Sequence, residues 1–481
     1  MQYSIVNTSN LDNIVFRLDA EFYHPSNLAL ESKLSNVDSI SIRDASGKID
    51  CSAFYPSIVP YYNFEYKGIP FLRVNEIQNG LLHITNDTAF LPEHILDANK
   101  STIAKCYPGD LIIAKGGNSL AKVALLTDEY PVYSICRDLI VIRTNDLKYF
   151  NKYYIWMFFH SKIGKQLLLR TASQTGQPHL TVEALYEIKI PKFSPDFQNY
   201  FQWLYQKSED LKEASRQSAK SMDKVLIHAL GLSSYNPSHS MFFTKSYVDT
   251  LDIARLDAEY FQPKYLPIHE AISKFPHRQI GDFENFDITT GQYCANYVSQ
   301  EDGFPYIRGT DLDNGIVNIE NLKFISPSEQ VLEKKAEEGD VVVTRVGTIG
   351  LAARIPTECS AGTISDNLIR IRILSGNEID SYYLACFLGS SIGKALMIQK
   401  GRGSVQQRLN QETLKEIPLP IIDSKIQNKI KSYMQQSFNY RKNAHNLLEF
   451  AKISIEKAIF DSQEESKVWL SKTIDQSFYN I

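Results

Sequence analysis

The chain has 481 residues, of which 43% are hydrophobic and 22% are charged, and its formal net charge is −4. This composition is ordinary for a globular protein and argues against a fibrous or disordered chain. No run of about 18 apolar residues is present, and the first residues lack the basic flank and apolar stretch of a signal peptide, so we expect no membrane partner and a cytoplasmic location. The six cysteines lie far apart without a CxxC pair, which favours free thiols.

The sequence contains an internal repeat. The run RLDAEFYHP from Arg17 returns as RLDAEYFQP from Arg255, and PGDLIIAKGG from Pro108 returns as EGDVVVTRVG from Glu338. Later anchors, SICRDLIVIR and TISDNLIRIR, keep the same order while the offset drifts from 238 to 229 residues, so the small insertions belong in loops. We therefore predict two copies of one domain, each large enough to bury its own core.

Each copy is predicted to be a mixed α/β unit. Short runs rich in β-branched residues and bounded by Gly, Pro or Asp predict strands at residues 110–115, 138–143, 340–345 and 367–372. Longer apolar runs predict packed helices at 149–169 and at 381–397.

A stripe of apolar and small residues follows each copy. From Phe197 to Ala229, and again from Ile426 to Ala458, these residues alternate at spacings of four and three. That period of 3.5 is typical of a coiled coil, and each stripe needs an apolar partner. We predict that the two helices pair antiparallel, connected by a Gly-, Pro- and Ser-containing linker. Packing of each helix on its own domain is the alternative.

The predicted fold class is therefore α/β (mixed α+β), with two duplicated domains joined by two long antiparallel helices in a pseudo-two-fold arrangement. The expected boundaries are a first domain at 1–195, a first spacer helix at 196–230, a linker at 231–246, a second domain at 247–422, a second spacer helix at 423–460 and a C-terminal tail at 461–481.

Enzyme motifs are not found in the sequence. It has no P-loop, no HExxH and no cysteine–histidine cluster with metal spacing. The nearest string to an amino-methyltransferase loop, NPSH at Asn236, falls in the linker. Asp110 and Asp340 follow glycine before a predicted strand in both copies, which favours turn chemistry. We therefore predict no catalytic residue and no metal ligand in this chain.

Basic and polar side chains recur near the predicted loops of both copies. Arg73 and Arg308 follow strands, and Lys115 and Arg345 end strands that run into glycine-containing loops, where a phosphate could approach. An ordinary solvated strand end is the alternative. The loops at 170–180 and 399–409 are rich in side chains that bond phosphates and base edges, and they differ most between the copies. The candidate DNA-binding residues are Arg73, Lys115, Asn118, Gln174, Thr175, Gln177, His179, Arg308, Arg345, Thr348, Arg402, Ser404, Gln406, Gln407 and Arg408.

These motifs resemble the specificity (S) subunit of type I restriction-modification systems over nearly all of residues 1–460. The resemblance rests on the repeated RLDAE(F/Y)(Y/F)xP and on TGQPHLTVEALYEIKIP from Thr175, which SVQQRLNQETLKEIPLP from Ser404 repeats. Gly176 of the first copy has Val405 as its counterpart, so that glycine is not kept. The resemblance implies a non-catalytic subunit of a defence system, with two target-recognition domains that bind a bipartite, asymmetric double-stranded DNA target.

The resemblance also implies partners. Two modification (methyltransferase) subunits and two restriction (ATP-driven endonuclease) subunits would be positioned on the DNA by this chain. It would hold no cofactor itself, and S-adenosylmethionine, ATP and Mg²⁺ would bind to those partners. Two alternatives stay open: the specificity subunit of a related type II enzyme, and a non-catalytic protein scaffold that binds no DNA.

Overall fold

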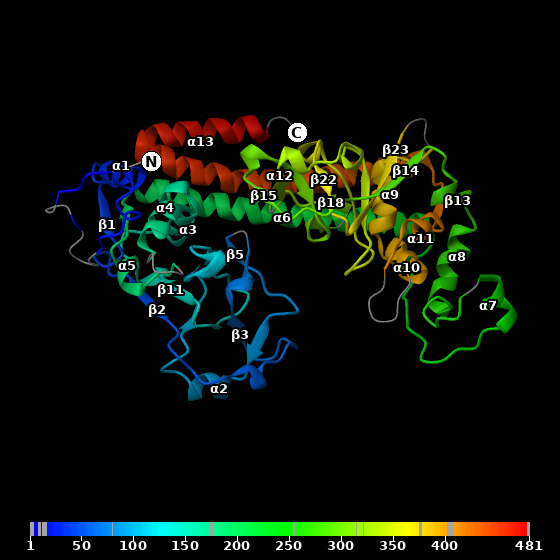
Figure 1. Ribbon diagram of the computed structural model, residues 1–481, viewed down its shortest axis with the longest axis horizontal. Coiled ribbons are helices and arrows are strands. Elements are labelled where there is room, and N and C mark those ends of the chain that lie inside the picture. The colour runs from blue at the N-terminus through cyan, green and yellow to red at the C-terminus, as the bar shows by residue number, and fades with distance from the viewer. Residues whose placement is uncertain are drawn as a thin grey trace. The chain divides into compact units, whose positions relative to one another are not determined.

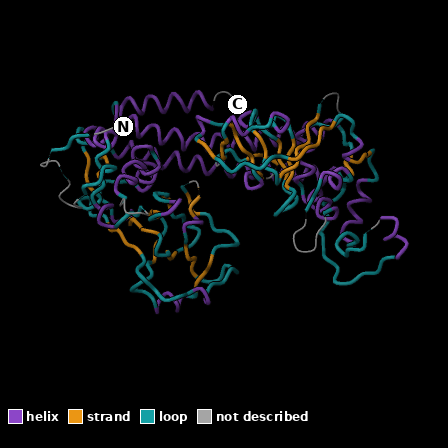
Figure 2. Tube along the Cα trace, viewed as in Figure 1, coloured by secondary structure: helices purple, strands orange, loops and turns teal. Residues whose placement is uncertain are grey.

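The two sequence copies fold into two units with matching orders of secondary-structure elements. The computed structural model describes residues 4–7, 11, 17–78, 80–172, 178–253, 255–313, 315–320, 322–374, 378–401 and 408–478. It separates into unit 1, which is Met1–Glu209 with Asn443–Ile481, and unit 2, which is Asp210–Lys442. The elements are labelled in Figure 1, and Figure 2 shows helices and strands mixed within each unit. The predicted mixed α+β class is confirmed.

The described part of unit 1 has a large sheet, a smaller sheet and a separate strand pair. The large sheet has the order β2-β11-β8-β9-β5-β4, the smaller one the order β6-β3-β10-β7, and β1 pairs with β12. Their bounds are β1 Ser39–Ser41, β2 Lys48–Cys51, β3 Ile69–Leu72, β4 Ile77–Gln78, β5 Leu81–Leu82, β6 Ala89–Leu91, β7 Lys105–Cys106, β8 Leu111–Ala114, β9 Val123–Leu125, β10 Tyr133–Ile135, β11 Leu139–Arg143 and β12 Lys189–Pro191.

Unit 2 repeats this topology in its described residues. Its large sheet has the order β14-β23-β20-β21-β18-β17, its smaller sheet the order β15-β19-β16-β22, and β13 pairs with β24. In the smaller sheets, the Lys335–Thr363 bridge of unit 2 stands where β7 pairs with β10 in unit 1. The bounds are β13 His277–Gln279, β14 Phe286–Thr290, β15 Tyr297–Val298, β16 Phe304–Ile307, β17 Leu312–Asp313, β18 Gly315–Val317, β19 Lys323–Ile325, β20 Val341–Thr344, β21 Ala352–Arg354, β22 Thr363–Ile364, β23 Leu368–Ile373 and β24 Pro418–Pro420.

The two apolar runs predicted as single helices are each broken into two. Ser161 and Ser390 take extended backbone conformations, with ψ of 160° and 165°, and their side chains accept hydrogen bonds from the amides of Gly164 and Gly393. The second helix folds back tightly, because a Cβ on Gly164 would lie 1.9 Å from the carbonyl oxygen of Phe158. The shorter helices are α1 Pro25–Leu34, α2 Glu93–Ala98, α3 Lys152–His160, α4 Lys162–Thr171, α5 Val182–Tyr186, α7 Tyr247–Ile253, α8 Leu266–Ile272, α9 Ser381–Gly389, α10 Ser391–Lys400 and α11 Gln411–Lys415.

Two long helices, α6 (Pro195–Ala229) and α12 (Ser424–Phe460), pair antiparallel as predicted. In unit 1 the start of α6 packs on the end of α12, and in unit 2 the end of α6 packs on the start of α12, where Leu226 and Ile430 share one core. The segment expected as a tail contains a further helix, α13 (Gln463–Phe478), whose Leu470 is fully buried. None of the helices in the described ranges has both the length and the apolar character needed to cross a membrane.

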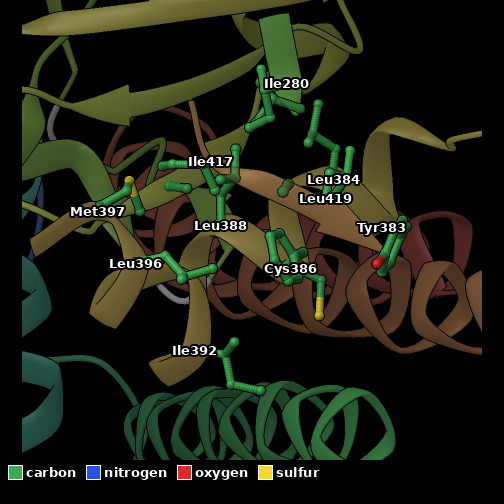
Figure 3. Close-up of a cluster of buried hydrophobic side chains, with 14 of the residues drawn as sticks. Ile280, Tyr383, Leu384, Cys386, Leu388, Ile392, Leu396, Met397, Ile417 and Leu419 are labelled. Carbon is green, nitrogen blue, oxygen red and sulfur yellow. The ribbon is translucent and has the colours of Figure 1, made fainter. Parts of the chain in front are cut away.

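A buried core fixes each large sheet to the helices that cover it. Figure 3 shows this core in unit 2, where Tyr383 and Leu388 of α9, Leu396 of α10 and Leu419 of β24 converge. All four side chains are fully buried. Truncating one such side chain typically costs about 2 to 5 kcal/mol of stability, so the sheets are rigid supports for the loops at their strand ends.

Candidate nucleic-acid interface

The ends of the central strands β8 and β20 place a cation at the same point of each unit. Lys115 follows β8 and donates its amide to the carbonyl of Asp138 at 2.9 Å, and Arg345 follows β20 and donates to that of Asn367 at 3.0 Å. Both strands then enter a loop through a left-handed glycine, Gly117 in unit 1 and its counterpart in unit 2, with φ of 66° and 80°. The predicted residues Asn118 and Thr348 are exposed on these loops.

A second loop crosses each strand end. Leu180 donates its amide to the carbonyl of Lys115 at 2.8 Å, and Leu409 donates to that of Arg345 at 2.9 Å. Isolated β-bridges join Gly116 to His179 in unit 1 and Val346 to Arg408 in unit 2. The structure therefore brings the predicted residues His179 and Arg408 beside the predicted strand-end cations. Seven other predicted residues lie outside the described part of the chain, namely Gln174, Thr175, Gln177, Arg402, Ser404, Gln406 and Gln407.

The strand end of unit 1 forms one wall of an open cleft of about 570 Å³. Its lining includes Phe54, Lys115, Arg137, Asp138 and His179. Among the described residues, the side chains of Lys115 and Arg137 form no ion pair and no hydrogen bond. Two cations against one carboxylate make this cleft attractive to an anion such as a phosphate.

Two groups next to the cleft, Tyr55 and Cys136, stay neutral near pH 7. Burial raises the pKa of Tyr55 to about 12, and burial raises the pKa of the Cys136 thiol to about 11. Neither group therefore adds negative charge to the cleft that Lys115, Arg137 and Asp138 line.

Unit 2 carries different chemistry at the matching point. The Nη1 of Arg345 donates to the carbonyl of Asp366 at 3.3 Å, while its buried Nε has no hydrogen-bond partner within the described ranges. Asp366 occupies the repeat position of Arg137, and exposed Arg408 occupies that of His179. The scaffold is shared, but the charges that it displays are not.

The predicted cations Arg73 and Arg308 occupy a different environment. Each donates a side-chain hydrogen bond to a buried carboxylate three residues on, Arg73 to Glu76 at 3.1 Å and Arg308 to Asp311 at 2.8 Å. The same carboxylates accept the backbone amides of these arginines at 2.8 Å and are only 3% and 4% exposed. Both arginines therefore stabilise the local fold by pairing with a buried carboxylate. That they also bind DNA stays a prediction.

The Gly-Asp pairs before β8 and β20 form turns. Asp110 accepts the amide of Tyr107 at 2.9 Å, and Asp340 accepts that of Glu337 at 2.8 Å. Burial raises the pKa of Asp110, although Arg143 donates to the carboxylate at 2.8 Å and opposes this shift. The two carboxylates therefore stabilise the turn before each strand, as predicted from the sequence.

Sequence reasoning missed Arg137 and the exposed aromatic residue Phe54 in the cleft. A signal for Arg137 was present, because the aligned anchors SICRDLIVIR and TISDNLIRIR reverse the charge at this one position, from Arg137 to Asp366. The position of Phe54 is set by strand pairing, which the sequence alone did not reveal.

The chain thus contains two duplicated α+β units whose equivalent loops carry unlike side chains. Residues 273–449 match the protein family described as the type I restriction modification DNA specificity domain. This segment is therefore similar to part of the specificity subunits of type I restriction-modification systems.

Solved structures of such subunits are also similar to this chain. The S subunit of a type I system from M. genitalium is 16% identical, with a TM-score of 0.41, over 88% of this chain and 96% of that one. The HsdS subunit from Thermoanaerobacter tengcongensis is 16% identical, with a TM-score of 0.27, over 87% and 97%. No curated protein matches the chain.

Proposed function

We propose that this chain is the DNA-recognition subunit of a type I restriction-modification complex, in which each unit reads one half of a bipartite, asymmetric duplex target. The observation that carries the proposal is that equivalent loops display different side chains on one scaffold. The loops of unit 1 carry Lys115, Arg137 and His179. At the equivalent positions, unit 2 carries Arg345, Asp366 and Arg408. Identical scaffolds with unlike loops suit two half-sites of unlike sequence.

The residues of the chain act by binding and orienting, without catalysis. Lys115 and Arg408 supply positive charge at the loops and would contact phosphates, which fix the register of the protein on the duplex. The loops that precede His179 and Arg408, with Gln174, Gln177, Arg402 and Gln406, would read base edges, because Arg can pair with guanine and Gln with adenine. The long helices α6 and α12 would set the length of the unread gap between the half-sites.

The subunit would place two modification subunits, which bind S-adenosylmethionine, and the ATP- and Mg²⁺-dependent restriction subunits on the bound DNA. The cytoplasm, where the DNA of the host is accessible, is the compartment that this role requires. The chain itself would hold no cofactor. Its contribution to methylation and cleavage is the choice of site.

The test begins with the genomic methylation pattern of the host with and without this gene, which identifies the target. The complex of the chain with its modification subunit is then measured on the cognate duplex and on a scrambled one at two salt concentrations. We expect tighter binding of the cognate duplex at both. Equal affinity for the two duplexes, with an unchanged methylation pattern, would contradict the proposal and favour a scaffold without DNA.

Replacing residues 1–195 by the first unit of another specificity subunit tests the modular reading. We expect one half of the methylated motif to change and the other to stay the same. A change in both halves would show that the units do not read independently.

A further inference from the structure

Each unit exposes a large aromatic side chain three residues after the first strand of its large sheet, β2 in unit 1 and β14 in unit 2. Phe54 is 79% exposed in unit 1 and Tyr293 is 75% exposed in unit 2. Single exposed aromatic side chains also occur elsewhere on this chain, so the informative observation is that these two recur at one position of a duplicated fold.

The two rings occupy the same position of the repeat. Cys51 at the end of β2 pairs with Ile140, and Thr290 at the end of β14 pairs with Ile369. Ile140 and Ile369 are the same residue of the aligned anchors SICRDLIVIR and TISDNLIRIR. Each ring therefore follows the last residue of its strand by three residues. Phe54 and Tyr293 are 239 residues apart, a larger offset than that of the sequence anchors before and after them.

The residue that follows each ring points inward and is not the same in the two units. Tyr55 packs edge-on against Phe71, with ring centroids 6.1 Å apart. Its counterpart Cys294 is 5% exposed and belongs to a small core with Tyr306. The inner residue has changed from a half-buried tyrosine to a buried cysteine, while the exposed residue has stayed aromatic. Packing acts on the inner position and does not explain an aromatic ring at the exposed one, so the retained ring points to a ligand common to both units.

The chain segment of each ring is joined to the strand-end cation of its unit. Phe54 lines the cleft that contains Lys115 and Arg137. In unit 2, Gln292, the residue before Tyr293, accepts the amide of Asp366 at 3.0 Å, and the carbonyl of Asp366 accepts Arg345. A flat apolar face next to a cation matches a nucleotide, which offers a base to stack on and a phosphate to neutralise.

We propose that Phe54 and Tyr293 each stack against a base of their own half-site, as wedges at a partly opened base step of the duplex. This inference rests on the proposed function and adds the residues that would deform the DNA. Side chains that enter base steps in other proteins partly unstack them, and the aromatic contact offsets that cost. Because the rings are alike in both units, they would position each half-site while the unlike loops specify its sequence.

The experiment uses the full chain with its modification subunit and the cognate duplex, with the adenine analogue 2-aminopurine scanned through each half-site. Its fluorescence rises where a base loses its stacking. We expect Phe54→Ala to weaken cognate binding by about 5- to 150-fold, the range for losing one stacked base, and to abolish the fluorescence rise in one half-site only. Tyr293→Ala should do the same in the other half-site.

Two further variants control the comparison. Phe54→Trp keeps a stacking face and should retain both signals, whereas Phe242→Ala removes a 91% exposed ring in the linker and should change nothing. Cognate affinity of Phe54→Ala equal to that of Phe242→Ala would overturn the inference while leaving the proposed function intact. Failure of the unaltered complex to discriminate cognate from scrambled duplex would instead remove the proposed function.

Discussion

Ser208 donates its hydroxyl to the backbone carbonyl of Ala444 at 3.1 Å, joining α6 to α12 within unit 1. The repeat places Ser437 at the position of Ser208 and Ala444 at that of Ser215, and in unit 2 Ser437 donates to the carbonyl of Ser215 at 3.0 Å. One contact is thus made twice, with the roles of the two helices exchanged. Ser208 and Ala444 are fully buried, so small side chains here let the two backbones approach closely.

Enlarging this position should therefore destabilise the helix pair. Ser208→Leu forces a larger side chain into a filled seam, and we expect a loss of about 1 to 3 kcal/mol in the free energy of unfolding, measured by denaturant titration. Gln217→Leu, at an exposed position of the same helix, is the matched control and should shift stability by less than about 0.5 kcal/mol. Equal stability of the two variants would mean that the seam is loosely packed.

Alanine variants should divide the cations of the candidate interface into two groups. Some should lower the stability of the fold, and others should weaken DNA binding. Arg73→Ala leaves the buried carboxylate of Glu76 without its side-chain partner, and we expect a loss of about 1 to 3 kcal/mol in unfolding free energy. The double variant Arg73→Ala with Glu76→Gln should recover part of this loss, because the unpaired charge is then gone.

Lys115→Ala should behave in the opposite way. Its side chain makes no hydrogen bond or ion pair within the described residues, so stability should change by less than about 0.5 kcal/mol. If Lys115 contacts a phosphate, binding of cognate and scrambled duplexes should weaken alike, and the dependence of log affinity on log salt should lose about one unit of slope. Loss of discrimination at a single base would instead identify Lys115 as a base-reading residue.

The stability of unit 1 should depend on pH through His160. Burial lowers the pKa of this histidine to about 4, and its Nε2 lies 3.1 Å from the carbonyl oxygen of Val123. The unfolded chain, with a pKa near 6.5, takes up the proton first, so stability is complete above pH 6.5 and falls by up to about 3 kcal/mol as the pH drops to 4.

The comparison is with His160→Gln, which cannot take up a proton in this range. Unfolding free energies at pH 7 and pH 5 should differ more in the unaltered chain than in this variant. Unit 2 has Gly389 at the same position, so it should not share this dependence. Identical pH profiles of the two proteins would place the titration on another group.

The fold was largely predictable because its signals are local. The strands around Ile112 and Val342 are β-branched runs bounded by turn residues, and β8 and β20 are found there. The helix breaks at Ser161 and Ser390 were missed because apolar residues continue across them, and the sharp fold-back depends on close contact of Gly164 with the backbone before it. Periodicity carries no information on such a contact.

The candidate site was less predictable because partners and exposure are tertiary properties. The charge of Arg308 was visible in the sequence, but its pairing with buried Asp311 depends on packing. The correspondence of Phe54 with Tyr293 was hidden because an insertion shifts the offset between the flanking anchors, and the pairing of β2 and β14 was needed to recover it.

Lengthening α6 and α12 together should change the spacing of the target without changing its halves. Inserting seven residues into each helix keeps the apolar stripes in phase, because the seam repeats every seven residues. The added rise is about 10 Å, which corresponds to about three base pairs of duplex. We expect the methylated motif of the host to keep both half-sites and to gain about three unread base pairs between them. Insertion into α6 alone is the control and should disrupt the Ser208–Ala444 register and abolish methylation. A motif whose gap stays the same after the paired insertion, in a complex that still methylates, would show that the long helices do not set the distance between the half-sites.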